Sequence, residues 1–366
     1  DIKMKCKGAS WYIEGDIEQQ FPPLNHKFLI SILNSRIHDQ AFVDMVSKYM
    51  KVGVIQGGIL FPILANIYMH PFDEWVTEYL KPNFDKGDKR VKNPEYFKKH
   101  RQEGQKVKEK TIRSVLTQQD FYFKRLYYFR YADDFIISVD GMKEDCRNLR
   151  NQIKEFLSNK INLTLNIEKT KITNAQCESA KFLGYILHKT PMNKIPIRWD
   201  KRSRLVRVVP RLITYAPIRE IVKKLIEKNY AKRNGNPTRN GRFINHKLAD
   251  IINHYKTVER KIIYYYSLAN NYSNLAVKVH FILKYSSILT IASKMKLKTK
   301  KKVFKKYGKD LNILNEKGKI IACYPTIDYR KPKKIYTKSI KKYDKDLVKT
   351  LESRLNRGRK DLKGHL

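Results

Sequence analysis

Cysteine is scarce in this chain of 366 residues. The cysteines are Cys6, Cys146, Cys177 and Cys323. They are far apart and show no paired spacing, so the sequence excludes a disulfide framework and a zinc site built from cysteine pairs. Such a pattern suits a reducing compartment.

Long apolar runs are also lacking. The most apolar helical stretch, residues 275–292, is interrupted by Lys278, His280 and Lys284, whereas a membrane span needs about 20 predominantly apolar residues. The first residues, Asp-Ile-Lys-Met-Lys, have neither the apolar centre of a signal peptide nor the pattern of a transit peptide, and residue 1 is not Met. We therefore expect a soluble protein with no membrane partner, whose natural start lies upstream.

Acidic residues are few, and they are unevenly distributed. The chain has 77 Lys and Arg against 35 Asp and Glu, a formal net charge of +42. Residues 1–80 carry a net charge of −2, residues 81–200 carry +11 and residues 201–366 carry +33. So much uncompensated charge favours a polyanionic partner, above all nucleic acid. A generally basic RNA-packaging protein would explain the charge but not its gradient, which favours a catalytic first part joined to a nucleic-acid-binding second part.

Two adjacent acids stand inside a run that otherwise has the composition of a buried strand. Residues 129–139 read Phe-Arg-Tyr-Ala-Asp-Asp-Phe-Ile-Ile-Ser-Val, and the nearest cation is Arg130. Ionised carboxylates in an apolar setting must be paired or bind metal. The pattern predicts a β-hairpin whose tip presents Asp133 and Asp134 to a hard cation such as magnesium. A solvated turn is the alternative reading of an isolated Asp-Asp pair.

A second source of carboxylate precedes the hairpin. Residues 11–17 are β-prone and contain Asp16, and a helical pattern follows over residues 28–37. After the hairpin come a helix over residues 145–157, a loop and strand over 163–172, and one strand over 181–187. This order predicts an α+β fold, a small antiparallel sheet with helices on one face, which is the plan of a polymerase palm. Asp16 and the hairpin tip would then lie on neighbouring strands, as two-metal phosphoryl transfer requires.

The basic second part of the chain, residues 201–366, has helical patterns. Amphipathic patterns predict helices that begin at Pro217, near residue 245 and near residue 274, and that form a small bundle. The link over residues 231–242 contains the candidate RNA-binding residues Arg233, Arg239 and Arg242. The expected domains are a palm over residues 1–200 with a basic insertion at about 81–110, a helical RNA-binding domain over 201–309 and a basic extension over 310–366.

The ordered motifs resemble the group II intron reverse transcriptase and maturase family, in its organellar branch. In the first part they are Trp11 to Ile17, Gln56-Gly57-Gly58 through Tyr68, Asn93 to Tyr96, Tyr131 to Asp134, Leu165-Asn166 with Glu168 to Thr170, and Phe182 to Tyr185. In the second part they are Ala216 to Ile218, Tyr265 to Ser267 with Ala269 to Asn271, and Lys305 to Gly308. The resemblance implies that the bundle is the thumb and maturase region.

The resemblance also implies roles. Asp16 and Asp133 would be direct ligands of two Mg²⁺ ions, with Asp134 the neighbouring acid of the catalytic and metal site. Four residues would form the nucleotide and template pocket: Phe21, Gln56, Gly57 and Lys169. Gly184 would belong to the primer grip. The implied partners are group II intron RNA, a DNA primer or target and deoxynucleoside triphosphates, and the implied location is the mitochondrion, with the plastid as alternative.

Departures from the family pattern leave the activity open. Pro22 follows Phe21, Ile55 precedes Gln56, and Phe61 precedes Pro62, where the family usually has Asp, Pro and Ser. No counterpart of the amino-terminal fingers or of the carboxy-terminal endonuclease is visible, so we expect feeble polymerisation by this chain. We interpret the chain as an RNA-directed DNA polymerase and maturase that assists the splicing of its intron and copies RNA into DNA. The alternative is an RNA-binding splicing factor that keeps an inactive palm.

Overall fold

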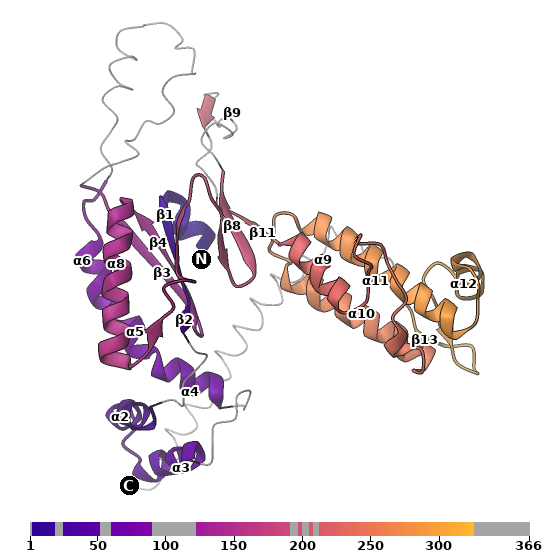
Figure 1. The fold of residues 1–366 in the computed structure, drawn as a ribbon, viewed down its shortest axis with the longest axis horizontal. Helices are drawn as coiled ribbons and strands as arrows, with labels where there is room; N and C mark the ends of the chain where they lie inside the picture. The colour runs from indigo at the N-terminus through magenta and orange to yellow at the C-terminus, as the bar shows by residue number, and fades with distance from the viewer. Residues whose placement is uncertain are drawn as a thin grey trace, which may run out of the picture. The chain divides into compact units, whose positions relative to one another are not determined.

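The computed structural model describes residues 2–18, 25–51, 60–89, 122–190, 197–199, 205–207 and 212–325. The chain divides into two compact units, residues 1–213 and 214–366 (Figure 1). Because residues 200–204, 208–211 and 326–366 lie outside the described ranges, the domain limits expected at 200 and 309 stay predictions.

The first unit is built on an antiparallel sheet. Its strands, in spatial order, are β3 (Arg125–Tyr131), β4 (Asp134–Asp140), β1 (Trp11–Gly15) and β6 (Lys171–Asn174). β1 is paired with β4 so that Gly15 lies opposite Phe135, and with β6 so that Glu14 lies opposite Lys171. The predicted hairpin and the predicted neighbourhood of Asp16 and the hairpin tip are therefore confirmed.

Helices cover one face of this sheet. Figure 1 shows α8 (Lys143–Phe156) and α5 (His70–Glu74) on the same side of the strands. The other helices of this unit are α1 (Ile2–Lys5), η1 (Cys6–Gly8), α2 (His26–Arg36), α3 (Gln40–Lys51), α4 (Phe61–Tyr68), η2 (Trp75–Leu80), α6 (Lys81–Phe84) and η3 (Leu157–Ile161). The predicted α+β class with helices on one face is confirmed. The helical stretch reaches Phe84, so the first residues expected in the insertion of 81–110 belong to α6, and residues 90–121 lie outside the described part.

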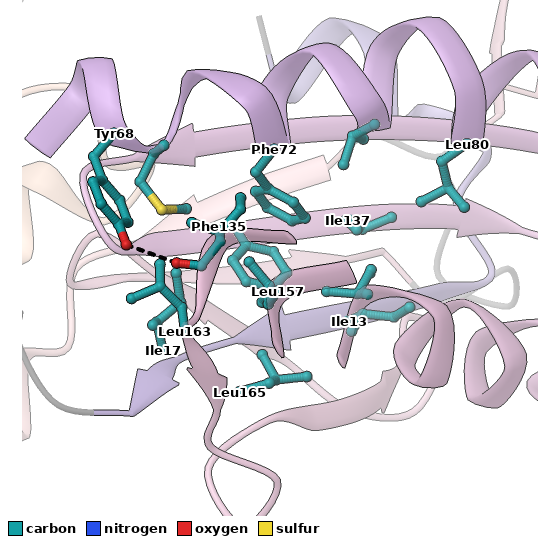
Figure 2. Packing of buried hydrophobic residues seen from close by; sticks show 14 of the residues in the cluster. Ile13, Ile17, Tyr68, Phe72, Leu80, Phe135, Ile137, Leu157, Leu163 and Leu165 are labelled. Atoms are coloured by element: carbon teal, nitrogen blue, oxygen red, sulfur yellow. Dashed lines mark hydrogen bonds between the residues drawn. The ribbon is translucent and has the colours of Figure 1, made fainter. Parts of the chain in front are cut away.

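The core lies between this helical layer and the sheet. Phe72 of α5 is fully buried, and its ring lies 5.4 Å from that of Phe135 and 5.6 Å from that of Tyr128 (Figure 2). The Tyr68 hydroxyl donates a hydrogen bond of 2.7 Å to the carbonyl of Ile161. Aromatic pairs in these geometries contribute about 0.5–1.5 kcal/mol beyond the area they bury. This core fixes β4, and with it the position at which the strand begins.

A second apolar cluster lies on the opposite face of the sheet. It contains Cys6, Tyr12 and Phe182, and its strands are β7 (Ala180–Phe182), β8 (Tyr185–Lys189) and β11 (Leu212–Tyr215). The single strand predicted over residues 181–187 is wrong: Leu183 (φ 48°) and Gly184 (φ 70°) form a turn between two paired strands. Glycine adopts positive φ at no steric cost, so it permits the chain to reverse inside an apolar run.

The second unit contains the helices α9 (Ile218–Glu227), η5 (Gly241–Phe243), α10 (Leu248–Tyr265), α11 (Tyr272–Lys294) and α12 (Lys300–Tyr307), and a hairpin of β12 (Ile313–Leu314) and β13 (Ile320–Ala322). The predicted helices are present as α9, α10 and α11. α11 is long and apolar enough to meet the composition of a membrane span, but 67% of that stretch is buried inside the unit. Packing inside the unit therefore explains why α11 is apolar.

The short strands not yet named are β2 (Ile17–Glu18), β5 (Thr164–Leu165), β9 (Ile197–Trp199) and β10 (Leu205–Arg207).

Candidate active site

The hairpin tip consists of Ala132 and Asp133. Tyr131 and Asp134 are paired across the hairpin, so only two residues make the reversal. Ala132 lies in the left-handed region (φ 55°), which costs an L-residue roughly 1–2 kcal/mol. A residue is held in such a conformation only when its surroundings fix it.

Arg130 holds Ala132 in this conformation. Its Nη1 donates to the carbonyl of Ala132 at 2.7 Å and to Oδ1 of Asn66 at 3.2 Å. Its Nε and Nη2 donate to the two carboxylate oxygens of Asp73 at 2.7 and 2.5 Å, and its side chain is only 9% exposed. The Tyr128 hydroxyl donates to the same carboxylate at 2.7 Å. Burial, followed by the charge of Asp73, raises the pKa of Tyr128.

The partner of Arg130 is the main feature that the sequence did not predict. The cation nearest to Asp133 and Asp134 in sequence is paired with Asp73, which is 57 residues away along the chain. Only the covering of β3 by α5 brings the two together. Asp73 is followed directly by Glu74, so the sequence does not show which of the two acids needs a buried partner.

Asp16 follows the last residue of β1. Gly15 precedes it, and a β-carbon added there would lie 2.0 Å from the ring of Phe135. Glycine is therefore required at this position by the close approach of the ring. Because Phe135 follows Asp134, the same packing contact sets the relative positions of the two acids.

Residues 166–170, within the loop and strand predicted over 163–172, form a loop that lies against Asp16. The amide of Asn166 donates to the carbonyl of Asp16 at 2.9 Å, and Ile17 is paired with Leu165. The Nζ of Lys169 lies 3.3 Å from Oδ2 of Asp16, and the Lys169 amide donates to the Asn166 side chain at 3.0 Å. The structure thus brings Lys169 to Asp16.

The three acids act on one another electrostatically. Partial burial raises the pKa of Asp134 above its usual value, and the negative charges of Asp133 and then Asp16 raise it further. Such mutual repulsion marks a set of carboxylates that gains from a bound cation.

The donor set fits magnesium that is shared with a substrate. Among the residues that the structure describes, no group of three His, Cys, Asp or Glu side chains forms a ready-made metal cage. Mg²⁺ usually takes one or two carboxylates and completes its shell with water and substrate phosphates. Asp16, directly after β1, and Asp133, at the tip of the β3 to β4 hairpin, have the carboxylate chemistry of such a partial shell.

Gly184 belongs to the turn of a hairpin that is hydrogen-bonded to β1, the strand that precedes Asp16. The Glu14 carboxylate accepts a hydrogen bond from the amide of Lys181 at 2.8 Å and another from the hydroxyl of Thr173. Lys181 belongs to β7, whose turn contains Gly184. Three other predicted residues, Phe21, Gln56 and Gly57, lie outside the described residues.

The predicted RNA-binding arginines lie in the second unit. All three are exposed, and the link that contains them is held along α11. The Ser286 hydroxyl donates to the carbonyl of Thr238 at 2.6 Å, and the amide of Asn240 donates to the hydroxyl of Thr290 at 3.0 Å. Arg239 donates to Ser293 at 3.2 Å. The link is thus a fixed backbone with cationic side chains.

Acids at the meeting point of antiparallel strands β1 and β4, with helices on one face, define the chain as a palm-type nucleic-acid polymerase fold. Residues 1–187 match the family model described as reverse transcriptase (RNA-dependent DNA polymerase), and residues 209–352 match that of the type II intron maturase. The chain belongs to the group II intron-encoded reverse transcriptase and maturase family.

Similar proteins agree with this assignment. The putative COX1/OXI3 intron 1 protein of Saccharomyces cerevisiae is 36% identical over 92% of this chain and 44% of its own length. The group II intron-encoded protein LtrA of Lactococcus lactis is 32% identical over 81% of this chain and 55% of its own length. An uncharacterized mitochondrial protein of Marchantia polymorpha is 25% identical over 85% of this chain and 50% of its own length. The chain therefore spans about half the length of these relatives.

Proposed function

We propose that the first unit copies RNA into DNA by two-metal phosphoryl transfer and that the second binds group II intron RNA and assists its splicing. The observation that supports the polymerase part is the convergence of Asp16, Asp133 and Asp134 beside Lys169. Bound magnesium would supply charge stabilisation at the attacking and leaving oxygens. Asp16 and Asp133 would hold it, and Lys169 would neutralise a triphosphate.

The proposed partners are intron RNA, a DNA primer and deoxynucleoside triphosphates. The net charge of +33 over residues 201–366 supports the RNA, because phosphate contacts dominate the affinity of nucleic-acid binding. The proposed location is the mitochondrion. It is supported by the mitochondrial relative and by the heavy use of Lys, Asn, Ile and Tyr, which is typical of an AT-rich organellar genome.

The test is primer extension on an RNA template with the whole natural protein, with intron splicing followed in parallel. Asp133→Ala removes a ligand that acts in the transition state, so extension is expected to fall by some orders of magnitude. Intron RNA affinity is expected to stay unchanged. Glu144→Ala is the matched control, since Glu144 forms an exposed pair with Arg147 on α8.

An active polymerase and a splicing factor with an inactive palm give different results in this test. Loss of extension in Asp133→Ala with retained splicing supports a polymerase with a separable maturase function. If the wild type shows no magnesium-dependent extension but promotes splicing, the polymerase assignment fails, and the chain is an RNA-binding splicing factor with an inactive palm.

A further inference from the structure

A row of aromatic rings crosses from α11 to α12 in the second unit. The rings of Phe281 and Tyr285, one helical turn apart, have centroids 5.0 Å apart, and the ring of Phe304 on α12 lies 6.4 Å from that of Tyr285. Phe281 is 40% exposed, and the other two rings are half-buried. We call these three residues the ring row.

Lysine side chains lie over the ring row. The Nζ of Lys278 lies 5.9 Å from the centre of the Phe281 ring, and the Nζ of Lys300 lies 5.3 Å from that of Tyr285. Neither helix that contains the rings has an Asp or Glu: α11 reads YSNLAVKVHFILKYSSILTIASK and α12 reads KKKVFKKY. The surface is therefore aromatic and cationic without an acid on either helix.

Phe281 lies outside the buried side of α11. The buried residues of α11, among them Val279, Ile282 and Leu283, face the inside of the unit. Phe281 and Val277, by contrast, are 40% and 60% exposed. Exposed aromatic side chains with cations over them are an arrangement that binds unpaired nucleotides, because every base has a face that stacks on a ring.

Lys278 lies between the ring row and the link of residues 231–242, which we call the arginine link. The Nζ of Lys278 lies 4.0 Å from the position of a β-carbon at Gly235, which belongs to that link. Arg233, two residues before Gly235, is exposed, so the link offers a cation for phosphates while α11 and α12 offer rings for bases. A double-stranded RNA could use the cations but not the rings, because its bases are already stacked on one another.

We propose that the ring row is a stacking platform for unpaired bases of a folded RNA, with Lys278, Lys300 and the arginine link holding the adjoining phosphates. The proposal rests on the RNA-binding part of the proposed function and deepens it by naming unpaired nucleotides as the ligand. The lysines over the rings keep the site hydrated in the free protein and move aside to phosphate when a base stacks. Each ring then contributes about tenfold to the affinity for looped RNA.

The test uses the full chain and two RNA probes of equal length, a hairpin with an unpaired loop and a blunt duplex. Phe281→Leu and Tyr285→Leu keep an apolar side chain but remove the ring. Each is expected to weaken hairpin binding about tenfold and to leave duplex binding unchanged. Phe281→Tyr keeps the ring and is expected to bind the hairpin as tightly as the wild type does. Tyr264→Leu is the matched control, since Tyr264 is a similarly exposed ring, 44%, on α10 and is not a member of the ring row.

The salt dependence of RNA affinity distinguishes the contribution of the rings from that of the lysines. The ring variants are expected to keep the slope of log affinity against log salt, whereas Lys278→Gln and Lys300→Gln each reduce it by about one. A fluorescent base analogue in the loop should be quenched by the wild type and not by Tyr285→Leu.

Different results would overturn the stacking platform and the RNA-binding proposal. Equal losses on hairpin and duplex, or no loss in either ring variant, overturn the platform while leaving RNA binding intact. The same ring-dependent binding of an acidic peptide would assign the surface to a protein partner and also overturn it. A wild type that binds neither RNA would remove the RNA-binding part of the proposed function itself.

Discussion

The ammonium of Lys169 lies 3.3 Å from the carboxylate of Asp16. The lysine side chain is 71% exposed, so it is free to leave this position. If Asp16 holds magnesium as proposed, Lys169 competes with the metal for the same carboxylate, and its proposed role at the triphosphate would take it away from Asp16.

Lys169→Met is expected to strengthen the binding of magnesium and to weaken the binding of the deoxynucleoside triphosphate. Removing the competing ammonium should tighten magnesium binding in the absence of nucleotide by a few-fold, since exposed pairs are worth at most about 1 kcal/mol. The same change should raise the KM for the deoxynucleoside triphosphate. Magnesium titration and steady-state extension measure the two effects. Lys171→Met, an exposed change two residues along, is the control. A fall in magnesium affinity would contradict the competition.

Asp134→Asn is expected to stabilise the metal-free protein at neutral pH. The pKa of Asp134 is raised in the folded state, so its contribution favours folding below the unfolded value of about 4 and is lost as pH rises through the folded value. The ionised carboxylate then opposes folding, and Asn removes that repulsion. Urea unfolding with a chelator, at about pH 4 and about pH 7, should show a gain that appears only at the higher pH. An equal gain at both values would point to a cause other than charge.

Gly15→Ala is expected to destabilise the first unit by about 1–3 kcal/mol and to abolish extension, because the added methyl overlaps the buried ring of Phe135. The urea midpoint and primer extension measure this. Adding Phe135→Leu should recover part of the stability. Gly241→Ala is the control, since no atom lies within 4 Å of the added β-carbon. Unchanged stability in Gly15→Ala would contradict the packing contact.

Asp73→Asn is expected to reduce extension although Asp73 belongs to α5 and is not one of the three acids. The change leaves the nearly buried guanidinium of Arg130 without a counter-charge, at a cost on the order of 3 kcal/mol, and releases the carbonyl of Ala132 from its fixed position. Glu74→Gln is the matched control, because Glu74 forms an exposed pair with Arg36. Thermal unfolding and extension should both respond to Asp73→Asn alone. Full activity in that variant would remove the positioning role.

Replacing Arg233, Arg239 and Arg242 by Ala is expected to weaken binding of the cognate intron more than binding of an unrelated structured RNA. Cations on a fixed backbone match one folded shape, whereas phosphate contacts alone do not discriminate. The control removes the same charge from the basic extension through Lys333, Lys334 and Lys338. Equal losses on both RNAs would assign the link to nonspecific attraction.

The sequence predicted those parts of the site that depend on short stretches of chain. The Asp133 hairpin followed from two acids between β-prone runs, and the approach of Asp16 followed from the order of elements. The pairing of Arg130 with Asp73 joins residues far apart in sequence, so no local pattern encodes it. The turn at Gly184 was missed because apolar residues continue through it, and periodicity does not distinguish one strand from two short ones.

Glu14, Gly15 and Asp16 are consecutive, and each contacts a different part of the first unit: Glu14 contacts the β7 to β8 hairpin, Gly15 the ring of Phe135 and Asp16 the side chain of Lys169. Side chains alternate between the faces of a strand, so a shift of β1 by one residue would displace all three at once. Mutants selected for poor primer placement and mutants selected for lost chemistry should therefore be indistinguishable when they map to Trp11–Gly15. Separable classes should arise only outside this strand.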